Sequence, residues 1–313
     1  MINMNYIFRM NDYYDIYKKG KKYKHVYNNK IVSDSIENKI KKLGIPPAYK
    51  KVWLSKKSNN KVQAISFDNK NRKQYKYHPT FIEKGKLSKY RRLKKFIKIQ
   101  SSFKRKINED LKISSSLKDC VIANMFVIMM KTNIRVGNKK YCLENGSYGL
   151  TTMLKRHLNN DCTFNFKGKS GIKHSIKIKD ERLKKFFKYL KRIPGKELFK
   201  YKEDNVIKVV TSNDMNDYLQ NKTGQDFTCK DFRTLSSNMY FIKYIKNLQI
   251  PLNKTQSKQN IVSSLNKTAE KLGHNRSTSK NSYVSPKVIE KYTKHPNAFS
   301  RAKNIKKFLY KIL

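Results

Sequence analysis

Hydrophobic positions in the first quarter of the chain follow the short alternation that is typical of strands. Residues 61–67 have the sequence Lys-Val-Gln-Ala-Ile-Ser-Phe, residues 68–71 form a polar turn cluster, and residues 72–77 alternate again. Two such runs around a turn predict a β-hairpin. Pro46 and Pro47 argue against a helix at that point, because proline lacks the backbone N–H that a helix interior needs.

Beyond residue 84 the hydrophobic positions recur with a helical period. Leu93, Phe96, Ile97 and Phe103 are spaced in this way among the lysines of residues 87–111. This spacing predicts a long, basic, amphipathic helix.

Three further elements are predicted in the middle of the chain. Residues 117–133 are apolar on nearly all sides, so we expect a buried central helix. Residues 150–158 fit a short helix. Residues 163–166 and 174–178 alternate on either side of a glycine-bracketed tip at residues 167–171, which predicts a second hairpin.

Helical periods dominate from Arg182 onward. Thr228 and Asp231 have the spacing of a capping box at the start of one helix. Gly273 has the position of the glycine that ends another helix. The polar residues 253–259 are expected to form a linker.

Chain length and the change of period together indicate two domains. A single hydrophobic core seldom extends over a chain of 313 residues. We therefore predict an α+β protein. A small N-terminal β-rich domain is expected at residues 1–84, and a larger, mainly α-helical domain at residues 85–313.

The charge balance indicates a polyanionic partner. The chain has 72 Lys and Arg residues against 22 Asp and Glu, which gives a formal net charge of +50. An AT-rich coding bias would enrich lysine, but it would not deplete the acidic residues. A protein with this charge repels itself unless a polyanion neutralises it. Together with the aromatic content, the charge predicts binding to nucleic acid.

Cysteine usage and hydropathy favour a soluble protein of an intracellular, reducing compartment. Cys120, Cys142, Cys162 and Cys229 form no C-x-x-C pair and have no histidine at ligand spacing. This pattern argues against structural zinc and indicates free thiols. The N-terminus lacks the apolar segment of a signal peptide. The most apolar segment, residues 121–130, has about half the length of a membrane span, so no membrane partner is expected.

Five side chains are candidates for chemistry on an anion. Arg135 follows the predicted buried helix, Lys169 lies at the tip of the second hairpin, and Arg233 lies early in a helix whose dipole also favours an anion. His274 follows the helix-ending glycine, and Tyr283 comes nine residues later. Each alone has a plainer interpretation: a solvated arginine, a loop lysine, a capping histidine or a packing tyrosine. Their order and surroundings together favour one site.

The order and spacing of these residues resemble the small poxvirus-type DNA topoisomerases of type IB. The resemblance covers nearly the whole chain, and the last two stretches are the most specific because both internal spacings fit. The matching stretches are Gly44-Ile-Pro-Pro-Ala48, Arg72-Lys-Gln-Tyr-Lys-Tyr77, Ile134-Arg-Val-Gly137 with Tyr141 and Gly149-Leu150, Gly168-Lys169, Lys230-Asp-Phe-Arg-Thr234, Thr268-Ala-Glu270 with Gly273-His274, and Ser279-Lys280-x-x-Tyr283.

The resemblance implies an enzyme that nicks one strand of double-stranded DNA through a 3′-phosphotyrosyl intermediate. Supercoils of either sign then relax, and the strand is religated. No metal, ATP or other cofactor is implied, which agrees with the absence of a Walker-type phosphate loop from the sequence. The implied catalytic residues are Arg135, Lys169, Arg233, His274 and Tyr283.

The resemblance also implies that the N-terminal domain clamps DNA. The residues expected to contact DNA are Arg72, Gln74, Tyr75, Tyr77, Lys140 and Tyr141. Ser170 and Asn138 depart from the family pattern, so the family's cleavage-site preference is not carried over to this chain. We expect a monomer. If the chain is viral, we expect it in the replication compartment of the host cell and in the virion.

Two other functions compete with this one. A tyrosine recombinase or integrase shares the same set of catalytic residues. Recombinases usually have His-x-x-Arg around the second arginine, whereas this chain has Lys230-x-x-Arg233. A non-catalytic basic DNA-packaging protein would explain the charge. It would not explain five spaced residues in the order of an active site.

Overall fold

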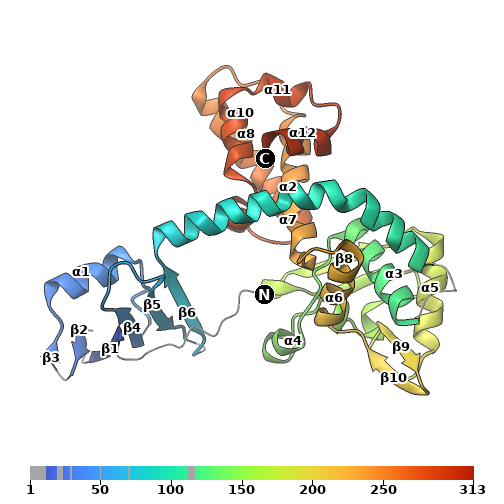
Figure 1. Cartoon of the computed structure of the whole chain (residues 1–313), viewed down its shortest axis with the longest axis horizontal. Coiled ribbons are helices and arrows are strands. Elements are labelled where there is room, and N and C mark those ends of the chain that lie inside the picture. The colour runs from blue at the N-terminus through green and yellow to red at the C-terminus, as the bar shows by residue number, and fades with distance from the viewer. Residues whose placement is uncertain (1–11, 20–23, 29, 50, 70, 112–116) are drawn as a thin grey trace. The chain divides into compact units, whose positions relative to one another are not determined.

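The computed structural model describes residues 12–19, 24–28, 30–49, 51–69, 71–111 and 117–313. The chain divides into two compact units, Met1–Lys89 and Tyr90–Leu313. Figure 1 labels the helices and strands of both units. Helix α2 (Pro79–Asp110) begins in the first unit and continues into the second. The domain boundary expected at residue 84 therefore lies inside a continuous helix.

The first unit contains an antiparallel six-stranded sheet of order β3-β2-β1-β4-β5-β6. The first predicted hairpin is confirmed as β5 and β6, with Ile65 opposite Tyr75. The strands are β1 (Tyr13–Lys19), β2 (Lys24–Tyr27), β3 (Lys30–Ile31), β4 (Lys51–Ser55), β5 (Val62–Phe67) and β6 (Lys73–Tyr77). The core of this unit consists of Ile16, Val32, Ile40, Ile45, Val52, Leu54 and Ala64.

Helix α1 (Asp34–Lys42) lies in a part of the chain where only strands and turns were expected. Asp34 and Glu37 lie in its first turn and lysines lie in its last, which suits the helix dipole. Only Ile40 of this helix is fully buried. Ile36, Ile40 and Leu43 recur at helical spacing and pack on the core of this unit, so the sequence carried a signal for this helix that the prediction did not use.

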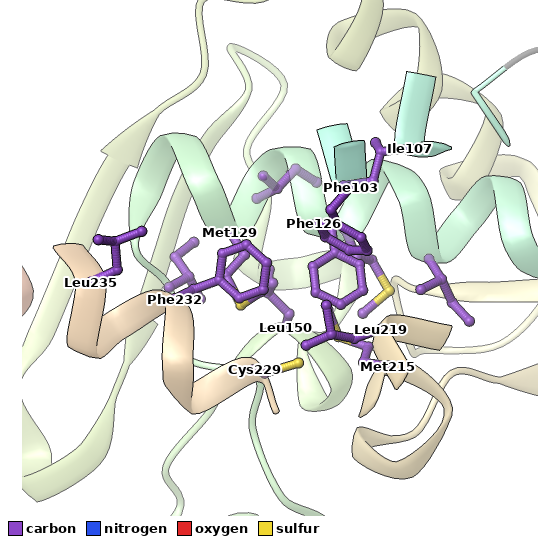
Figure 2. Close-up of a cluster of buried hydrophobic side chains, with 14 of the residues drawn as sticks. Phe103, Ile107, Phe126, Met129, Leu150, Met215, Leu219, Cys229, Phe232 and Leu235 are labelled. Carbon is purple, nitrogen blue, oxygen red and sulfur yellow. The ribbon is translucent and has the colours of Figure 1, made fainter. Parts of the chain in front are cut away.

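The core of the second unit surrounds helix α3 (Leu117–Thr132). Phe126 of α3 lies 5.2 Å from Phe103 of α2 and 5.5 Å from Phe232 of α7 (Cys229–Ile245), measured between ring centroids. Figure 2 shows these three side chains in one cluster of buried hydrophobic residues. The buried central helix and the long amphipathic helix are both confirmed. Helix α2 begins earlier than predicted, at Pro79. Proline is tolerated there because the N–H of the first residue in a helix has no hydrogen-bond acceptor within the helix.

The rest of the second unit is mostly helical, with two small hairpins, and the α+β class is confirmed. None of the described helices is long and apolar enough to cross a membrane. The remaining elements are α4 (Lys139–Asn145), β7 (Thr163–Lys167) with β8 (Lys173–Lys177), α5 (Glu181–Arg192), β9 (Lys200–Glu203) with β10 (Val206–Val209), α6 (Ser212–Thr223), α8 (Lys254–Leu272), α9 (Arg276–Thr278), η5 (Ser279–Tyr283), α10 (Pro286–Lys294), α11 (Asn297–Ser300) and α12 (Ile305–Ile312).

Residues 150–158 do not form the predicted helix. They form two short 3-10 turns, Leu150–Thr152 and Lys155–His157. Between these turns the backbone pairs with a distant segment. The Leu198 N–H donates to the Met153 carbonyl at 2.9 Å, and the Lys155 N–H donates to the Lys196 carbonyl at 2.9 Å. These bonds use backbone groups that a continuous helix would need for itself.

Two expectations about the C-terminal half also need correction. Hairpin β9–β10 interrupts the helical region, and its turn residues Asp204 and Asn205 have φ angles of 48° and 61°, as a tight hairpin turn requires. The expected polar linker at residues 253–259 is instead the start of α8. The Asn253 side chain accepts a hydrogen bond from the Gln256 N–H at 2.8 Å. The polar side chains therefore belong to a capped helix.

Candidate active site

The backbone of Arg135 is fixed by a segment that runs beside it. The Arg135 carbonyl accepts from the Leu150 N–H at 2.9 Å, and the Val136 carbonyl accepts from the Thr151 N–H at 2.7 Å. The approach is so close that a Cβ on Gly149 would lie 2.6 Å from the Arg135 carbonyl oxygen. Packing therefore requires glycine at position 149, and this contact sets the point from which the arginine side chain projects.

The guanidinium of Arg135 faces the C-terminal end of α8. Two of its nitrogens donate to the Gly273 carbonyl, each at 3.3 Å. Gly273 ends α8 in the left-handed conformation, with φ 60° and ψ 60°, and the predicted helix-ending glycine is confirmed. Burial lowers the pKa of Arg135, but an arginine remains protonated in proteins. The turn that carries His274 is thereby tied to a partly desolvated cation.

Arg233 is a buried cation whose side chain donates to three acceptors. Its side chain donates to the Asn133 carbonyl at 2.9 Å, to the Leu272 carbonyl, and to Nδ1 of His274 at 3.0 Å. Only 8% of the residue is exposed. Burial, reinforced by the charge of Arg135, lowers its pKa to about 10. The guanidinium therefore stays charged, and protein acceptors replace the hydration of its two terminal nitrogens.

The start of α7, which carries Arg233, is held by the predicted capping pair. Asp231 accepts from the Thr228 N–H at 2.8 Å and from the Thr228 hydroxyl at 3.2 Å. The same carboxylate forms an ion pair with Arg92 of α2 at 2.9 Å. These contacts make the helix start rigid, just ahead of the buried arginine.

His274 is held in one tautomer by its two neighbours. An arginine can only donate, so Nδ1 of His274, which receives the Arg233 hydrogen bond, carries no proton. The proton is then on Nε2, which lies 2.7 Å from the Ser279 hydroxyl and donates to it. Burial lowers the pKa of His274 to about 4, with added effects from Arg233 and Arg135. The imidazole is therefore neutral near pH 7.

Tyr283 ends the π-helical turn η5, a local geometry often found at functional sites. Its ring stacks on the His274 ring with centroids 5.1 Å apart and an interplanar angle of 25°. The Arg233 guanidinium carbon lies 5.8 Å from the Tyr283 ring centroid. The Tyr283 carbonyl accepts from the buried Asn238 side chain at 3.0 Å. The structure thus brings four of the five candidate catalytic residues together, counting Arg135 on the adjoining turn.

Lys169 lies at the exposed tip of the β7–β8 hairpin, whose prediction is confirmed. The next residue, Ser170, has a φ of 62° and turns the chain. Lys169 and Arg135 both line a cavity of about 1110 Å³. His274 and Tyr283 do not line this cavity, so Arg135 connects it with the arginine–histidine–tyrosine cluster.

Two candidate DNA contacts lie on the short helix α4. Tyr141 is 62% exposed, and Lys140 also points to solvent. The side chain of Asn138 caps this helix and accepts from the Lys140 N–H at 2.9 Å. The unusual residue at position 138 therefore has a local structural role.

The other four candidate DNA contacts lie on or just before strand β6 of the first unit. Arg72 forms an ion pair with Asp68 at 2.7 Å, and the Gln74 amide donates to the same carboxylate at 3.1 Å. The rings of Tyr75 and Tyr77 are stacked with centroids 6.1 Å apart. The strand therefore presents a paired arginine and a two-tyrosine stack.

Some supporting residues were not assigned a role from the sequence. Asn238 and Ser279 are both 0% exposed and bind Tyr283 and His274, respectively. In the sequence, Asn238 is a polar residue on the apolar face of the predicted helix, and this position could have indicated a supporting role. All four cysteines are free, as predicted. Within the described part of the chain, no group of three His, Cys, Asp or Glu side chains could hold a metal ion.

Three viral proteins are similar to this chain over most of its length. DNA topoisomerase 1B of Acanthamoeba polyphaga mimivirus is 35% identical over 300 residues, which cover 92% of this chain and 89% of that protein. DNA topoisomerase 1B of vaccinia virus (strain Copenhagen) is 23% identical over 249 residues, or 77% of this chain and 75% of that protein. DNA topoisomerase 1 of rabbit fibroma virus (strain Kasza) is 28% identical over 244 residues, which cover 73% of this chain and 71% of that protein.

Family models match both parts of the chain. The model described as "Bacterial DNA topoisomerase IB, N-terminal domain" matches residues 22–68. The model described as "Eukaryotic DNA topoisomerase I, catalytic core" matches residues 70–309, which include all five candidate catalytic residues. The chain therefore belongs to the type IB DNA topoisomerase family.

Proposed function

We propose that this chain relaxes supercoiled double-stranded DNA by nicking and resealing one strand. The observation that carries the proposal is the contact of Arg233, His274 and Tyr283, with Arg135 bound to the turn before His274. A phenol beside fixed cationic and neutral hydrogen-bond donors is the arrangement that phosphoryl transfer to tyrosine needs. Membership of the type IB family supports the same reaction.

In the proposed reaction the Tyr283 phenol oxygen attacks a backbone phosphorus and loses its proton to solvent. A tyrosine–phosphate bond forms, and the bond from phosphorus to the 5′ oxygen breaks. Lys169 gives the departing 5′ oxygen a proton, a role that typically contributes roughly 10²- to 10⁴-fold in rate. One phosphodiester has replaced another, so the bond energy is kept. The free 5′ hydroxyl can therefore reverse the step without ATP once the DNA has swivelled.

The two arginines are assigned to the charge that develops on the phosphate. The transition state places additional negative charge on the non-bridging oxygens. Arg135 and Arg233 present planar donor groups that match such oxygens. Both are already partly or fully desolvated, so little solvent has to rearrange as the charge forms. The proposal assigns this role to the arginines and requires no metal ion.

His274 is assigned as a neutral hydrogen-bond donor to a non-bridging oxygen. Its Nε2–H, which donates to Ser279 in the structure, would turn to the phosphate when DNA binds. Arg233 would keep Nδ1 without a proton throughout. The imidazole therefore needs no change of protonation state between the resting chain and the reaction.

We further propose that residues 1–84 clamp the DNA and that residues 85–313 cut it, with the chain acting as a monomer. The net charge of +50 supports tight electrostatic binding. The similar proteins are viral, so the proposal includes a viral origin and action on DNA in the infected cell. The residues proposed to contact DNA are Arg72, Gln74, Tyr75, Tyr77, Lys140 and Tyr141.

A plasmid relaxation assay tests the proposal. Purified protein is incubated with negatively and with positively supercoiled plasmid, in EDTA and without ATP, and both plasmids are expected to relax. Tyr283→Phe, which lacks one oxygen atom, is the matched control. It is expected to bind DNA normally and to form no covalent adduct after denaturation. Folded wild-type protein that relaxes neither plasmid, or an undiminished adduct from Tyr283→Phe, contradicts the proposal.

A further inference from the structure

The ring of His174 fills the space between two turns of the second unit. One turn contains Gly168, which precedes Lys169, and the other contains Gly273, which precedes His274. A Cβ added to Gly168 would lie 2.7 Å from His174 Nε2, and one added to Gly273 would lie 2.4 Å from His174 Cε1. Close-packed protein interiors do not accommodate carbon contacts this short. His174 Nε2 and the two ring carbons bonded to it therefore lie between the two glycines.

The orientation of this ring is fixed from a second side. His174 pairs with Phe166 across β7 and β8. Their rings are stacked with centroids 4.9 Å apart and an interplanar angle of 17°. Phe166 is 8% exposed, so its own position is fixed by packing and it restrains the His174 ring. His174 also lines the cavity that Lys169 and Arg135 share.

The electrostatic surroundings favour the uncharged form of the ring. Burial lowers the pKa of His174, and the charges of Arg135 and Arg233 lower it further. A neutral imidazole can pack beside these two cations, whereas an imidazolium would be repelled by them. The ring is therefore suited to a packing role at this position.

We propose that His174 is a positioning residue for the proton transfer from Lys169. Its ring sets the distance between the hairpin tip and the end of α8, and so fixes Lys169 relative to Arg135 and His274. The inference rests on the proposed function. A lysine at an exposed tip has a flexible side chain, so its backbone must be well placed for it to reach one oxygen atom. Misplacement by about 1 Å can cost around 10²-fold in rate.

A change of leaving group tests the proposal. In a duplex whose 5′ bridging oxygen at the cleavage site is sulfur, the departing thiolate needs no proton, so the step served by Lys169 is bypassed. His174→Ala is expected to slow single-turnover adduct formation on the oxygen substrate by roughly 10- to 100-fold. This loss of rate is no larger than the roughly 10²- to 10⁴-fold loss expected when a general acid is removed. On the sulfur substrate it is expected to react at nearly the wild-type rate.

Two variants of the same hairpin serve as controls. Lys169→Ala is expected to show the same dependence on the leaving group, with a larger defect on oxygen. Asn165→Ala, an exposed change on β7, is expected to behave as wild type on both substrates. Equal slowing of both substrates by a folded His174→Ala overturns the positioning role and leaves the proposed function intact. A Lys169→Ala defect that sulfur does not relieve overturns the positioning role together with the general-acid assignment. A wild-type chain that forms no adduct overturns the proposed function itself.

A double-mutant cycle tests the contact between Gly168 and His174 directly, and the Gly168 variant alone can be used if His174→Ala is unstable. Gly168 has a φ of −90° and a ψ of −168°, a conformation open to any residue, so Gly168→Ala acts through its contact with His174. It is expected to slow the oxygen substrate and to spare the sulfur substrate. Combined with His174→Ala, it should cause little additional loss, because the ring it would strike is absent. Additive effects overturn the proposal, and thermal unfolding checks that each variant is folded.

Discussion

Arg233 donates to Nδ1 of His274 at 3.0 Å. This contact selects the histidine tautomer and places the buried guanidinium beside the ring of Tyr283. The proposed nucleophile and two of the groups assigned to the phosphate therefore lie in one cluster. The contribution of Arg233 to this arrangement depends on the planar shape of its guanidinium as well as on its charge.

Arg233→Lys keeps the charge but removes the planar group that reaches three acceptors. One ammonium cannot bond to the Asn133 carbonyl, the Leu272 carbonyl and His274 Nδ1 in this arrangement. We expect single-turnover adduct formation to fall by about 10²- to 10³-fold, the usual loss for one preorganised donor. DNA affinity should change little, because the net charge is the same. Arg182→Lys makes the same substitution at an exposed position of α5 and should react as wild type. A near-wild-type rate for Arg233→Lys would show that charge alone suffices.

The stability of the fold should depend on pH through His274. Its pKa is about 4 in the folded chain and about 6.5 when unfolded. Between these values the unfolded chain binds a proton that the folded chain does not, so acid favours unfolding. The stabilisation is fully present above about pH 6.5 and is lost as the pH falls toward 4. The melting temperature of the wild type should rise from about pH 5 to 7.

His274→Gln is the variant that checks this pH dependence. His157 and His174 also have lowered pKa values, so part of the rise should remain in the variant. Its melting temperature should increase less over the same pH range. An identical increase in wild type and variant would mean that His274 is not held neutral by the fold.

Elements with a strong period were predictable, and elements that depend on distant pairing were not. Helices α2 and α3 and hairpin β5–β6 show their periodicity within a single segment. Residues 150–158 have a helical pattern, but the carbonyl of Met153 bonds to Leu198. No local pattern reports a partner 45 residues away (198 minus 153). The start of α8 was missed for a different reason: its cap is local, since Asn253 accepts from the Gln256 N–H, but residues 253–259 are all polar and show no apolar period.

The candidate site shows the same division. The spacings around Arg135, Arg233, His274 and Tyr283 resemble a known family, and the structure brings these four together. The supporting residues could not be found in this way. His174 matters because two glycines, 105 residues apart (273 minus 168), both face its ring. That arrangement exists only in three dimensions.

Asn238 anchors the backbone at Tyr283. Its amide donates to the Tyr283 carbonyl at 3.0 Å, and its oxygen accepts from the Ser285 N–H at 2.8 Å. Asn238→Ala would leave both groups buried without this partner, at about 1–3 kcal/mol each. We expect lower stability in chemical denaturation and slower adduct formation per folded molecule. Asn281→Ala changes an exposed residue of the same turn and should have little effect. Wild-type stability in Asn238→Ala would show that the turn is held elsewhere.

Substitution of Gly149 and of Gly146 by alanine separates two effects of an added Cβ. At Gly149 the Cβ would clash with a neighbouring backbone, and at Gly146 it would strain only the local backbone conformation. A Cβ on Gly149 would lie 2.6 Å from the Arg135 carbonyl oxygen, although its φ of −149° suits any residue. Gly146 has a φ of 57° but open space around it. We expect Gly146→Ala to cost about 1–2 kcal/mol of folding free energy. Gly149→Ala should cost more and should also slow cleavage, because it displaces Arg135. Equal losses in urea unfolding would argue against the close packing beside Arg135.

Lys140 and Tyr141 are neighbours on α4 that should respond differently to salt. If six to ten phosphates are contacted, affinity for duplex DNA should fall by roughly 10³- to 10⁵-fold between 50 and 200 mM salt. Lys140→Ala removes one charge and should reduce the slope of log affinity against log salt by about 0.9. Tyr141→Ala removes an exposed, uncharged ring and should weaken binding while leaving the slope unchanged. Binding can be measured in a Tyr283→Phe background, which prevents covalent capture. An unchanged slope and affinity for Lys140→Ala would place α4 away from the DNA.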